Sequence, residues 1–181
     1  MRFQETKLSG AWSVELEVSR DERGFFARTF CETEFEAHGL PARFPQCNLS
    51  RNDKAGTLRG MHYNAAPYGE AKLVRCVRGA VHDVIIDLRR DSPTRGQWFG
   101  LDLTAESGNA LFVPPGFAHG FITLADATDV FYHMGATYQA GAARGFRYDD
   151  ALFDVPWPRR PSVISERDAT YPDFAWERCD A

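Results

Sequence analysis

The stretch Gly56-Thr-Leu-Arg-Gly-Met-His-Tyr-Asn-Ala-Ala-Pro-Tyr-Gly-Glu-Ala-Lys72 places three functional side chains in one short strand-turn-strand segment. Arg59 carries a forked guanidinium suited to a phosphate. His62 carries an imidazole, a side chain that can take up and release protons. Lys72 is a compact positive charge that can stabilise a developing oxyanion. Because turns bring functional side chains together, the combination indicates a site on this segment.

One geometrical conflict arises within this stretch. Strict strand alternation places Arg59 and His62 on opposite faces, because side chains three positions apart point in opposite directions. A bulge at Gly60, or the reach of the arginine, would bring both to one site. Each residue also has an ordinary interpretation, since a histidine in a strand is usually structural and an arginine is usually a solvated surface group.

A second stretch, Gly108-Asn-Ala-Leu-Phe-Val-Pro-Pro-Gly-Phe-Ala-His119, reads as a strand, a Pro-Gly turn and a histidine. Its Gly-x5-Pro-x-Gly-x2-His spacing resembles the second motif of the cupin β-barrels. The first stretch resembles a modified first cupin motif. Most metal cupins carry His-x-His followed by a glutamate in that motif, whereas this chain reads His62-Tyr63-Asn64 and lacks one ligand.

A more specific resemblance covers roughly the whole chain, because a series of short motifs occurs in a fixed order. The motifs are Asp21-x-Arg23-Gly24-x-Phe26, Gln46-x-Asn48-x-Ser50, Gly56-Thr-Leu-Arg-Gly-Met-His-Tyr63, Lys72-Leu-Val-Arg75, Gly79, Asp83-Val84, Asp87-Leu-Arg89, Ser92-Pro-Thr94, Gly116-Phe-Ala-His-Gly-Phe121, Tyr132, Trp157-Pro158 and Ser165-x-x-Asp168. Together they resemble the RmlC-type nucleotide-sugar epimerases (dTDP-4-dehydrorhamnose 3,5-epimerase-like) of the cupin superfamily.

Short runs of alternating apolar residues, separated by Gly, Pro, Asn and Asp clusters, predict many short strands. We expect strands within 1–20, 25–30, 44–51, 57–63, 71–78, 80–89, 97–104, 110–113, 117–124, 128–134 and 145–148. The pattern predicts a helix over 33–38 capped by Thr33, and a short helix opened by Ser165. Such a chain is typical of an antiparallel barrel or double-sheet sandwich. The resemblance implies a mainly β, cupin-type antiparallel β-barrel (jelly roll) with a few short helices, formed as a single domain over 1–181.

The run from Val81 to Leu88 shows the clearest alternation. It predicts a strand with Val81, Asp83, Ile85 and Asp87 on one face, and with alternate residues on the other face.

Composition limits the classes of protein to which the chain can belong. At 181 residues, 44% hydrophobic content and mean hydropathy −0.39, it is expected to be a soluble globular protein. The net charge of −4 argues against a nucleic-acid binder. No apolar run approaches a membrane span, and the N-terminal residues lack a signal-peptide core. Four scattered cysteines without a Cys-x-x-Cys pattern predict reduced thiols and a cytoplasmic location.

The resemblance implies epimerisation at carbons next to a ketone, a reaction that needs a base, a group that stabilises the enolate, and an acid on the opposite face. His62 would be the base and Asp168 its carboxylate partner. Lys72 would stabilise the enolate oxygen. Tyr132 would return a proton on the opposite face. Without the resemblance, Asp168 would be interpreted as a surface or helix-cap carboxylate, Lys72 as a surface lysine and Tyr132 as a core residue.

The resemblance also implies how the nucleotide sugar is bound. Eight residues match binding positions, and they are Arg23, Phe26, Gln46, Asn48, Arg59, His119, Tyr138 and Arg167. Among them, Arg59, Gln46 and Asn48 match the role of holding the phosphates. Arg23 and Phe26 match an N-terminal segment that reaches the neighbouring subunit's site, which implies a homodimer with segment exchange. Phe26 or Tyr138 would then stack on the base.

Three positions depart from the family pattern. Arg28 stands where the type enzymes usually carry a glutamate that contacts the base. Ala142-Ala143 stands where another pocket carboxylate is common, and His133 replaces a residue that is usually lysine or glutamine. The chemical groups remain, and the identity of the nucleotide base stays open.

Three functions are compared. The leading hypothesis is an epimerase that inverts C3, C5 or both of a nucleotide-linked 4-keto-6-deoxyhexose and needs no metal or other cofactor. The alternative is a metal-dependent cupin, such as a dioxygenase or isomerase, with His62, Glu70 and His119 as its possible ligands. The position of Asn64 disfavours it. A non-catalytic sugar-nucleotide binder is disfavoured because the base, lysine, tyrosine and carboxylate are all present.

Overall fold

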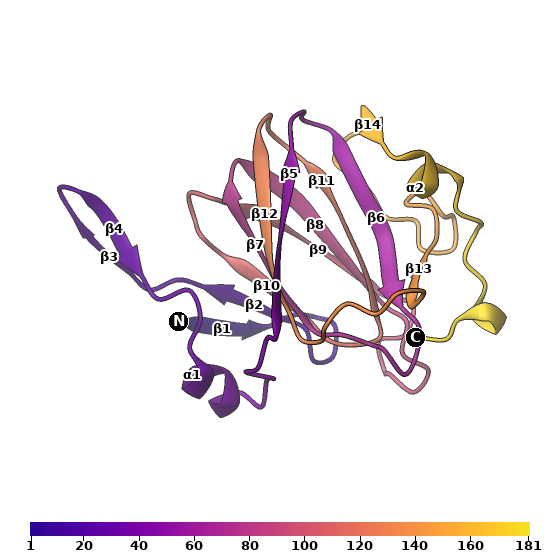
Figure 1. Ribbon diagram of the computed structural model, residues 1–181, viewed down its shortest axis with the longest axis horizontal. Helices are drawn as coiled ribbons and strands as arrows, with labels where there is room; N and C mark the ends of the chain where they lie inside the picture. The colour runs from indigo at the N-terminus through magenta and orange to yellow at the C-terminus, as the bar shows by residue number, and fades with distance from the viewer.

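The computed structural model describes residues 1–181 and is built from two six-stranded sheets that face each other (Figure 1). The first sheet has the order β1 (Arg2–Glu5), β2 (Trp12–Glu15), β10 (Ala110–Val113), β7 (Lys72–Arg78), β12 (Thr128–Met134) and β5 (Gln46–Asn52). The second has the order β13 (Ala143–Gly145), β6 (Thr57–Asn64), β11 (Phe117–Thr123), β8 (Ala80–Asp87) and β9 (Trp98–Thr104), with β14 (Val163–Ile164) parallel to β6. The jelly-roll prediction is confirmed, although the sheets do not close into a continuous barrel.

The helices are short. They are α1 (Glu32–Ala37), α2 (Glu166–Thr170) and the 3₁₀ turn η1 (Trp176–Arg178). The predicted Thr33 cap is wrong, because α1 begins one residue earlier and follows Cys31 without a side-chain cap. Ser165 does cap α2, since its Oγ accepts a hydrogen bond of 3.1 Å from the Asp168 N–H. No helix in the structure is long and apolar enough to cross a membrane.

Most strands from residue 44 onward lie within a few residues of their predicted bounds. The exceptions are at the two ends of the chain. The predicted strand over 1–20 is three separate strands, and the predicted strand 145–148 is β13, which ends at Gly145. At both ends, turns and a change of sheet partner interrupt a pattern that alternation alone does not resolve.

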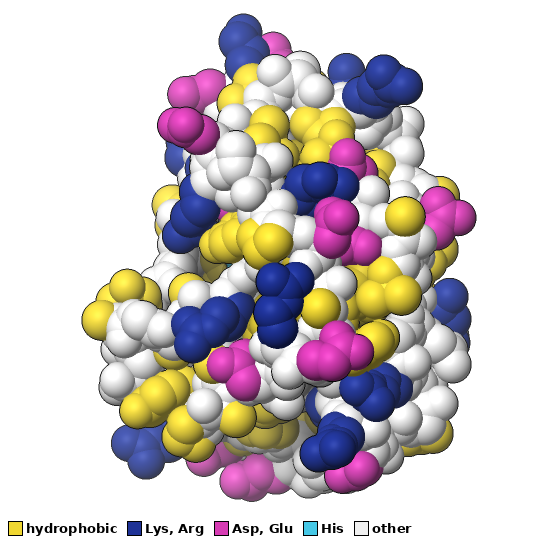
Figure 2. Space-filling view, turned by 90° about the vertical axis from the view of Figure 1, so that its right-hand side faces the viewer, with side chains coloured by type: hydrophobic (Ala, Val, Ile, Leu, Met, Phe, Trp, Pro, Cys, Tyr) yellow, Lys and Arg dark blue, Asp and Glu magenta, His cyan; other side chains and the backbone are white.

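Strand β8 lies between two apolar cores, which explains why apolar residues on both of its faces are buried. Val81 and Ile85 face the core between the sheets, whereas Val84 and Ile86 face a second core beneath the C-terminal segment. A third core, including Phe35 of α1, covers the outer face of the first sheet. Figure 2 shows the side of the molecule that carries the C-terminal segment, where basic, acidic and apolar side chains are interspersed.

An irregularity in β6 resolves the conflict between Arg59 and His62. His62 pairs with His119 of β11, and Arg59 pairs with Phe121, so β6 has one extra residue between the two pairs. Gly60 adopts φ +135 there, and a Cβ on it would lie 2.6 Å from the Gly120 Cα. Because paired residues share a face, the bulge turns Arg59 and His62 toward the same cavity.

A two-stranded arm projects from the body of the protein (Figure 1). It consists of β3 (Val18–Asp21) and β4 (Gly24–Ala27), which pair only with each other. Phe26 on this arm is 80% exposed. Since an isolated hairpin is only marginally stable in water, this arm has the features of a segment that packs on another surface.

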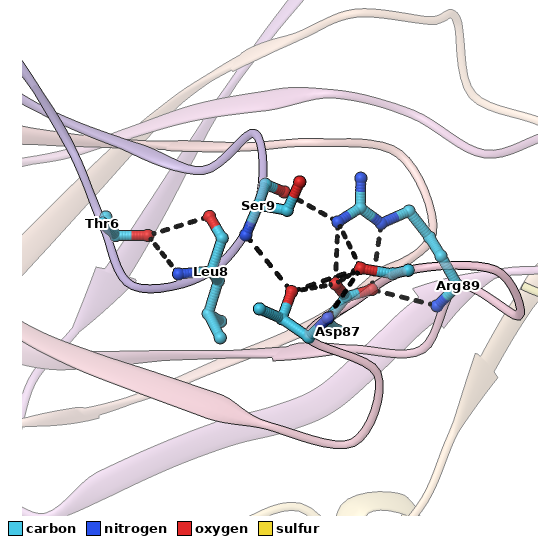
Figure 3. Close-up of polar contacts among 7 residues, drawn as sticks. Thr6, Leu8, Ser9, Asp87 and Arg89 are labelled. Carbon is cyan, nitrogen blue, oxygen red and sulfur yellow. Dashed lines mark hydrogen bonds and ion pairs between the residues drawn. The ribbon is translucent and has the colours of Figure 1, made fainter.

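Away from the cavity, the carboxylate of Asp87 ties β8 to the N-terminal turn (Figure 3). Asp87 is fully buried and accepts hydrogen bonds from Arg89, Ser92 and Thr94. Arg89 also donates to the Ser9 carbonyl at 2.7 Å. Burial raises the pKa of Asp87, but the hydrogen bonds from Arg89, Ser92 and Thr94 outweigh it and hold the pKa below its ordinary value.

The Asp87→Asn variant is expected to lose about 2–3 kcal/mol of stability at neutral pH, because Arg89 loses its buried charged partner. Because the folded-state pKa of Asp87 is lowered, its contribution is complete above the unfolded-state pKa and is lost as pH falls through the folded-state pKa. Urea unfolding from neutral pH to about pH 3 should therefore show a shallower acid loss in the variant. Equal midpoints for variant and wild type at neutral pH would contradict this assignment.

Candidate active site

A cavity of about 650 Å³ lies between the two sheets, on the side where β5 and β12 face β6. Eight of the predicted site residues line it, and they are Asn48, Arg59, His62, Lys72, His119, Tyr132, Arg167 and Asp168. They come from both sheets and from α2, so distant parts of the sequence meet here. Four predicted residues do not line the cavity, namely Arg23, Phe26, Gln46 and Tyr138.

His62 and Asp168 form a close pair, with His62 Nε2 2.8 Å from Asp168 Oδ1. The second oxygen of Asp168 accepts a hydrogen bond of 3.2 Å from the Gly60 N–H. Burial raises the pKa of Asp168, but the hydrogen bonds from His62 and Gly60 and the charge of Arg167 outweigh it and lower the pKa. An ionised Asp168 accepts a hydrogen bond from the Nε2–H of His62, which leaves His62 Nδ1 as the nitrogen with a free lone pair.

Two arginines line the same cavity. Arg167 lies close to both members, with Nε 3.5 Å from Asp168 Oδ1 and Nη2 3.5 Å from His62 Nε2. Arg59 is held by Asn52, whose Oδ1 accepts from Arg59 Nε at 2.8 Å. The Arg59 side chain therefore stands at the cavity with part of its fork free for an anionic group.

Lys72 and Glu70 form an ion pair within the cavity, with 3.5 Å between Lys72 Nζ and Glu70 Oε1. The two side chains are only 13% and 11% exposed. Glu70 appears in the sequence as a candidate metal ligand, and its role as the partner of Lys72 was not predicted. The i, i+2 spacing of the two residues, which places both side chains on one side of an extended chain, is the signal that could have predicted it.

Tyr132 lies on the opposite sheet from His62, since it belongs to β12 and His62 belongs to β6. Its ring meets the ring of His119 edge to face, with 6.1 Å between centroids. Burial and the negative charge of Asp83 raise the pKa of Tyr132. A phenol with a raised pKa stays protonated at neutral pH and can serve as an acid.

Gln46, Asn48 and Tyr138 form a chain of contacts at the edge of the first sheet. Gln46 Nε2 donates to Asn48 Oδ1 at 3.1 Å, and Gln46 Oε1 accepts from the Tyr138 N–H at 3.0 Å. Tyr138 is 73% exposed, so its ring is free to cover a ligand. Gln46 thus supports residues at the cavity edge without lining the cavity itself.

The arm residues lie apart from this cavity in the single chain. Arg23 pairs with Asp21 on the same hairpin, and Phe26 is exposed. Arg28 pairs with Glu34 at 3.1 Å, outside the cavity. Neither Arg23 nor Phe26 lines the cavity of its own chain.

The two cavity histidines do not converge on a metal-binding point. His62 directs Nε2 at Asp168, and His119 directs Nε2 at Asp83 at 2.9 Å. No group of three His, Cys, Asp or Glu side chains is arranged to hold a metal ion. The metal-dependent alternative therefore has no donor set in its favour.

Comparison with known proteins connects this geometry to one family. A family model described as dTDP-4-dehydrorhamnose 3,5-epimerase matches residues 5–175. A dTDP-4-dehydrorhamnose 3,5-epimerase of Shigella flexneri is 40% identical, with 93% of each chain covered.

Two solved structures show the same fold. The dTDP-4-dehydrorhamnose 3,5-epimerase of Bacillus anthracis, with TDP and PPi bound, superposes with a TM-score of 0.92 at 38% identity, covering 96% of this chain and 99% of that one. The 3'-monoepimerase ChmJ of Streptomyces bikiniensis, in complex with dTDP-quinovose, gives 0.86 at 32% identity, covering 93% and 85%.

Proposed function

This chain belongs to the dTDP-4-dehydrorhamnose 3,5-epimerase family, and from that membership we propose that it inverts C3, C5 or both of a dTDP-linked 4-keto-6-deoxyhexose. The observation that carries the proposal is the pairing of a carboxylate-held histidine on one sheet with a tyrosine on the other, across one cavity. Inversion needs proton removal and proton return on opposite faces of a carbon, and these two groups occupy opposite sides.

In this mechanism, His62 Nδ1 removes the proton next to the C4 ketone. The electron pair of the broken C–H bond moves to the ketone oxygen and forms an enolate. Asp168 stabilises the imidazolium that results, as a carboxylate does in other histidine–carboxylate pairs. Lys72 is a nearby cation that stabilises the enolate oxygen, and Glu70 keeps its ammonium in place.

Tyr132 then returns a proton from the opposite side. Its phenol is protonated at neutral pH, as an ordinary tyrosine is, and burial and Asp83 raise its pKa further, so it carries a proton that the enolate carbon can accept. Transfer leaves a phenolate, which regains its proton from solvent, while the His62 imidazolium releases to solvent the proton that it took from the sugar. The net result is an inverted centre and no change in oxidation state, so the steps need no redox partner.

The nucleotide end of the substrate would be held by the remaining residues. Arg59 and Arg167 offer guanidinium groups for the diphosphate, and Asn48 offers an amide. Tyr138 would cover the base by stacking. Since the family includes both 3,5-epimerases and a 3'-monoepimerase, either one or two centres could be inverted by the same groups.

The function is tested by NMR of a panel of 4-keto-6-deoxyhexose nucleotides in deuterated water. We expect deuterium to enter at C3, C5 or both of the dTDP-linked sugar, together with inversion at those carbons. The same spectra compare dTDP with other nucleotides, which addresses the departures at Arg28 and Ala142-Ala143. Absence of exchange with every member of the panel would refute the proposed function.

We further propose that the protein is a homodimer in which each arm reaches the partner's cavity. The arm pairs only with itself and exposes Phe26, and Arg23 is 83% exposed. Both residues match binding positions of the family, yet they lie outside the cavity of their own chain. Residues 1–181 would act as one domain, and the unpaired cysteines are consistent with work in the cytoplasm.

Mixing two inactive variants tests the exchange of arms. One is His62→Ala, which has an intact arm, and the other is the double variant Arg23→Ala and Phe26→Ala, which has an intact base. In a mixed dimer, the cavity with the intact base receives the intact arm. Co-expression should restore activity to roughly a quarter of wild type, since half of the dimers are mixed and each has one complete site.

The control for this experiment is each variant expressed alone, which should stay inactive. If the arm serves its own chain, the mixture will show no more activity than the average of the two separate variants. Sedimentation of a fully active monomer would also contradict the proposal.

A further inference from the structure

Asp83 is a buried carboxylate that the proposed reaction does not use directly. It lies on β8, is 0% exposed, and shares a face with Val81 and Ile85 in the core between the sheets. Its Oδ2 lies 2.9 Å from Nε2 of His119, which belongs to the neighbouring strand β11. Phe121 pairs directly with Asp83, so His119 reaches it diagonally across the two strands.

This position is unfavourable for a residue that serves only the fold. Asp83 Oδ1 is buried without any hydrogen-bond partner, which is uncommon for a carboxylate oxygen. An apolar side chain of similar size would fill the same place without burying an unpartnered charged group. Asp87, on the same face of the same strand, shows what a structural carboxylate looks like here, since it accepts hydrogen bonds from three side chains.

The contact fixes the orientation of His119. A carboxylate accepts hydrogen bonds and an imidazole N–H donates them, so the short Nε2–Oδ2 contact places a proton on Nε2. The other ring nitrogen, Nδ1, is then the atom of His119 that a bound molecule can meet. His119 lines the cavity between His62, its direct partner across the strands, and Tyr132, whose ring it contacts.

We propose that Asp83 is a positioning residue for epimerisation, which holds His119 with Nε2–H toward β8 and Nδ1 toward the sugar, and thereby aligns the sugar with Tyr132. The inference rests on the proposed function for its substrate. Asp83 on β8 is the charged group that contacts His119. Two titratable side chains also adjoin it, His62 on β6 and Tyr132 on β12.

The first test needs no substrate. In ¹⁵N-labelled wild-type protein, NMR of the imidazole groups should show His119 Nε2 carrying a proton that is protected from exchange with water. In the Asp83→Asn variant this protected proton should be lost, because a neutral amide holds an imidazole N–H more weakly and can donate to it instead. A wild-type His119 without a proton on Nε2, or an unchanged signal in the variant, would overturn the proposal.

The second test uses the ratio of net epimerisation to deuterium exchange. Asp83→Asn should lower this ratio roughly 10- to 100-fold, the usual effect of removing the group that orients a functional histidine. Exchange itself should continue, because His62 and Asp168 are untouched. Asp87→Asn is the matched control: it removes a buried carboxylate from the same strand face and should leave the ratio at the wild-type value.

A double-mutant cycle with His119→Gln shows whether Asp83 acts through His119. Once His119 is replaced, Asp83→Asn should change the ratio no further, so that the two effects are non-additive. Additive effects, or an Asp83→Asn ratio equal to wild type, would overturn the proposal. If wild-type protein exchanges no proton on any sugar nucleotide, the proposed function fails, while the NMR of His119 still decides the positioning of the ring.

Discussion

Replacing His62 with alanine is expected to lower deuterium exchange at every carbon next to the ketone by about two to four orders of magnitude, the usual contribution of a positioned base. The reason is that His62 is the cavity histidine held by Asp168, whereas the other cavity histidine, His119, is held by the buried Asp83. Exchange and epimerisation should fall together, because the enolate no longer forms. The measurement is NMR in deuterated water under single-turnover conditions.

The matched control for this variant is His82→Ala. His82 also pairs with a carboxylate, since its Nδ1 lies 2.6 Å from Asp102 Oδ1, yet neither residue lines the cavity. Its removal should leave exchange at the wild-type rate. Exchange that persists in His62→Ala at more than about a tenth of the wild-type rate would assign the base to another residue, with His119 the next candidate.

The second large effect is expected for Tyr132→Phe. This variant should separate deuterium exchange from net epimerisation, which His62→Ala abolishes together. His62 can still form the enolate and return a proton to the face from which it came. Deuterium should therefore enter with retained configuration, while net epimerisation falls by about two to four orders of magnitude. The measurement compares the deuterium content of recovered substrate with the amount of inverted product.

Folding should survive this substitution. The Tyr132 hydroxyl is buried near the charges of Asp83 and Arg59. It makes no hydrogen bond to the protein that the phenylalanine variant would lose. Tyr63→Phe is the control, because Tyr63 is also buried, with its pKa raised by burial to about 12, but lies outside the cavity. Equal losses of exchange and epimerisation in Tyr132→Phe would show that the tyrosine positions the substrate and is not a separate acid.

The faces of a strand were predictable from sequence where the strand lies between two apolar cores. Along β8, alternation correctly assigned Val81 and Ile85 to one face and Val84 and Ile86 to the other. The same rule failed to divide residues 1–20, where three short strands take different partners. The capping signature at Thr33 missed the start of α1, because that helix is held by Phe35 in the outer core and not by a capping side chain.

The site was predictable where a motif names a residue type and less so where a contact depends on tertiary geometry. The bulge at Gly60 was offered as one way to bring Arg59 and His62 together, and the strand register shows one. The pairing of Glu70 with Lys72 and of Asp83 with His119 was not predicted. An acidic residue within an apolar strand face was the available signal for Asp83, but Asp87 carries the same signal with a structural role.

The attachment of α2 and β14 to β6 has a consequence for behaviour on heating. A short parallel pairing of Val163 and Ile164 with Thr57 and Leu58, a few hydrogen bonds from Ser162 to the turn before β6, and the bonds to Asp168 hold this segment over the cavity. Local unfolding of so small a unit requires less free energy than separation of the two sheets. Asp168 would leave His62 while the jelly roll stays intact, so thermal inactivation would precede melting, and the docking of this segment would set the highest temperature at which the enzyme works.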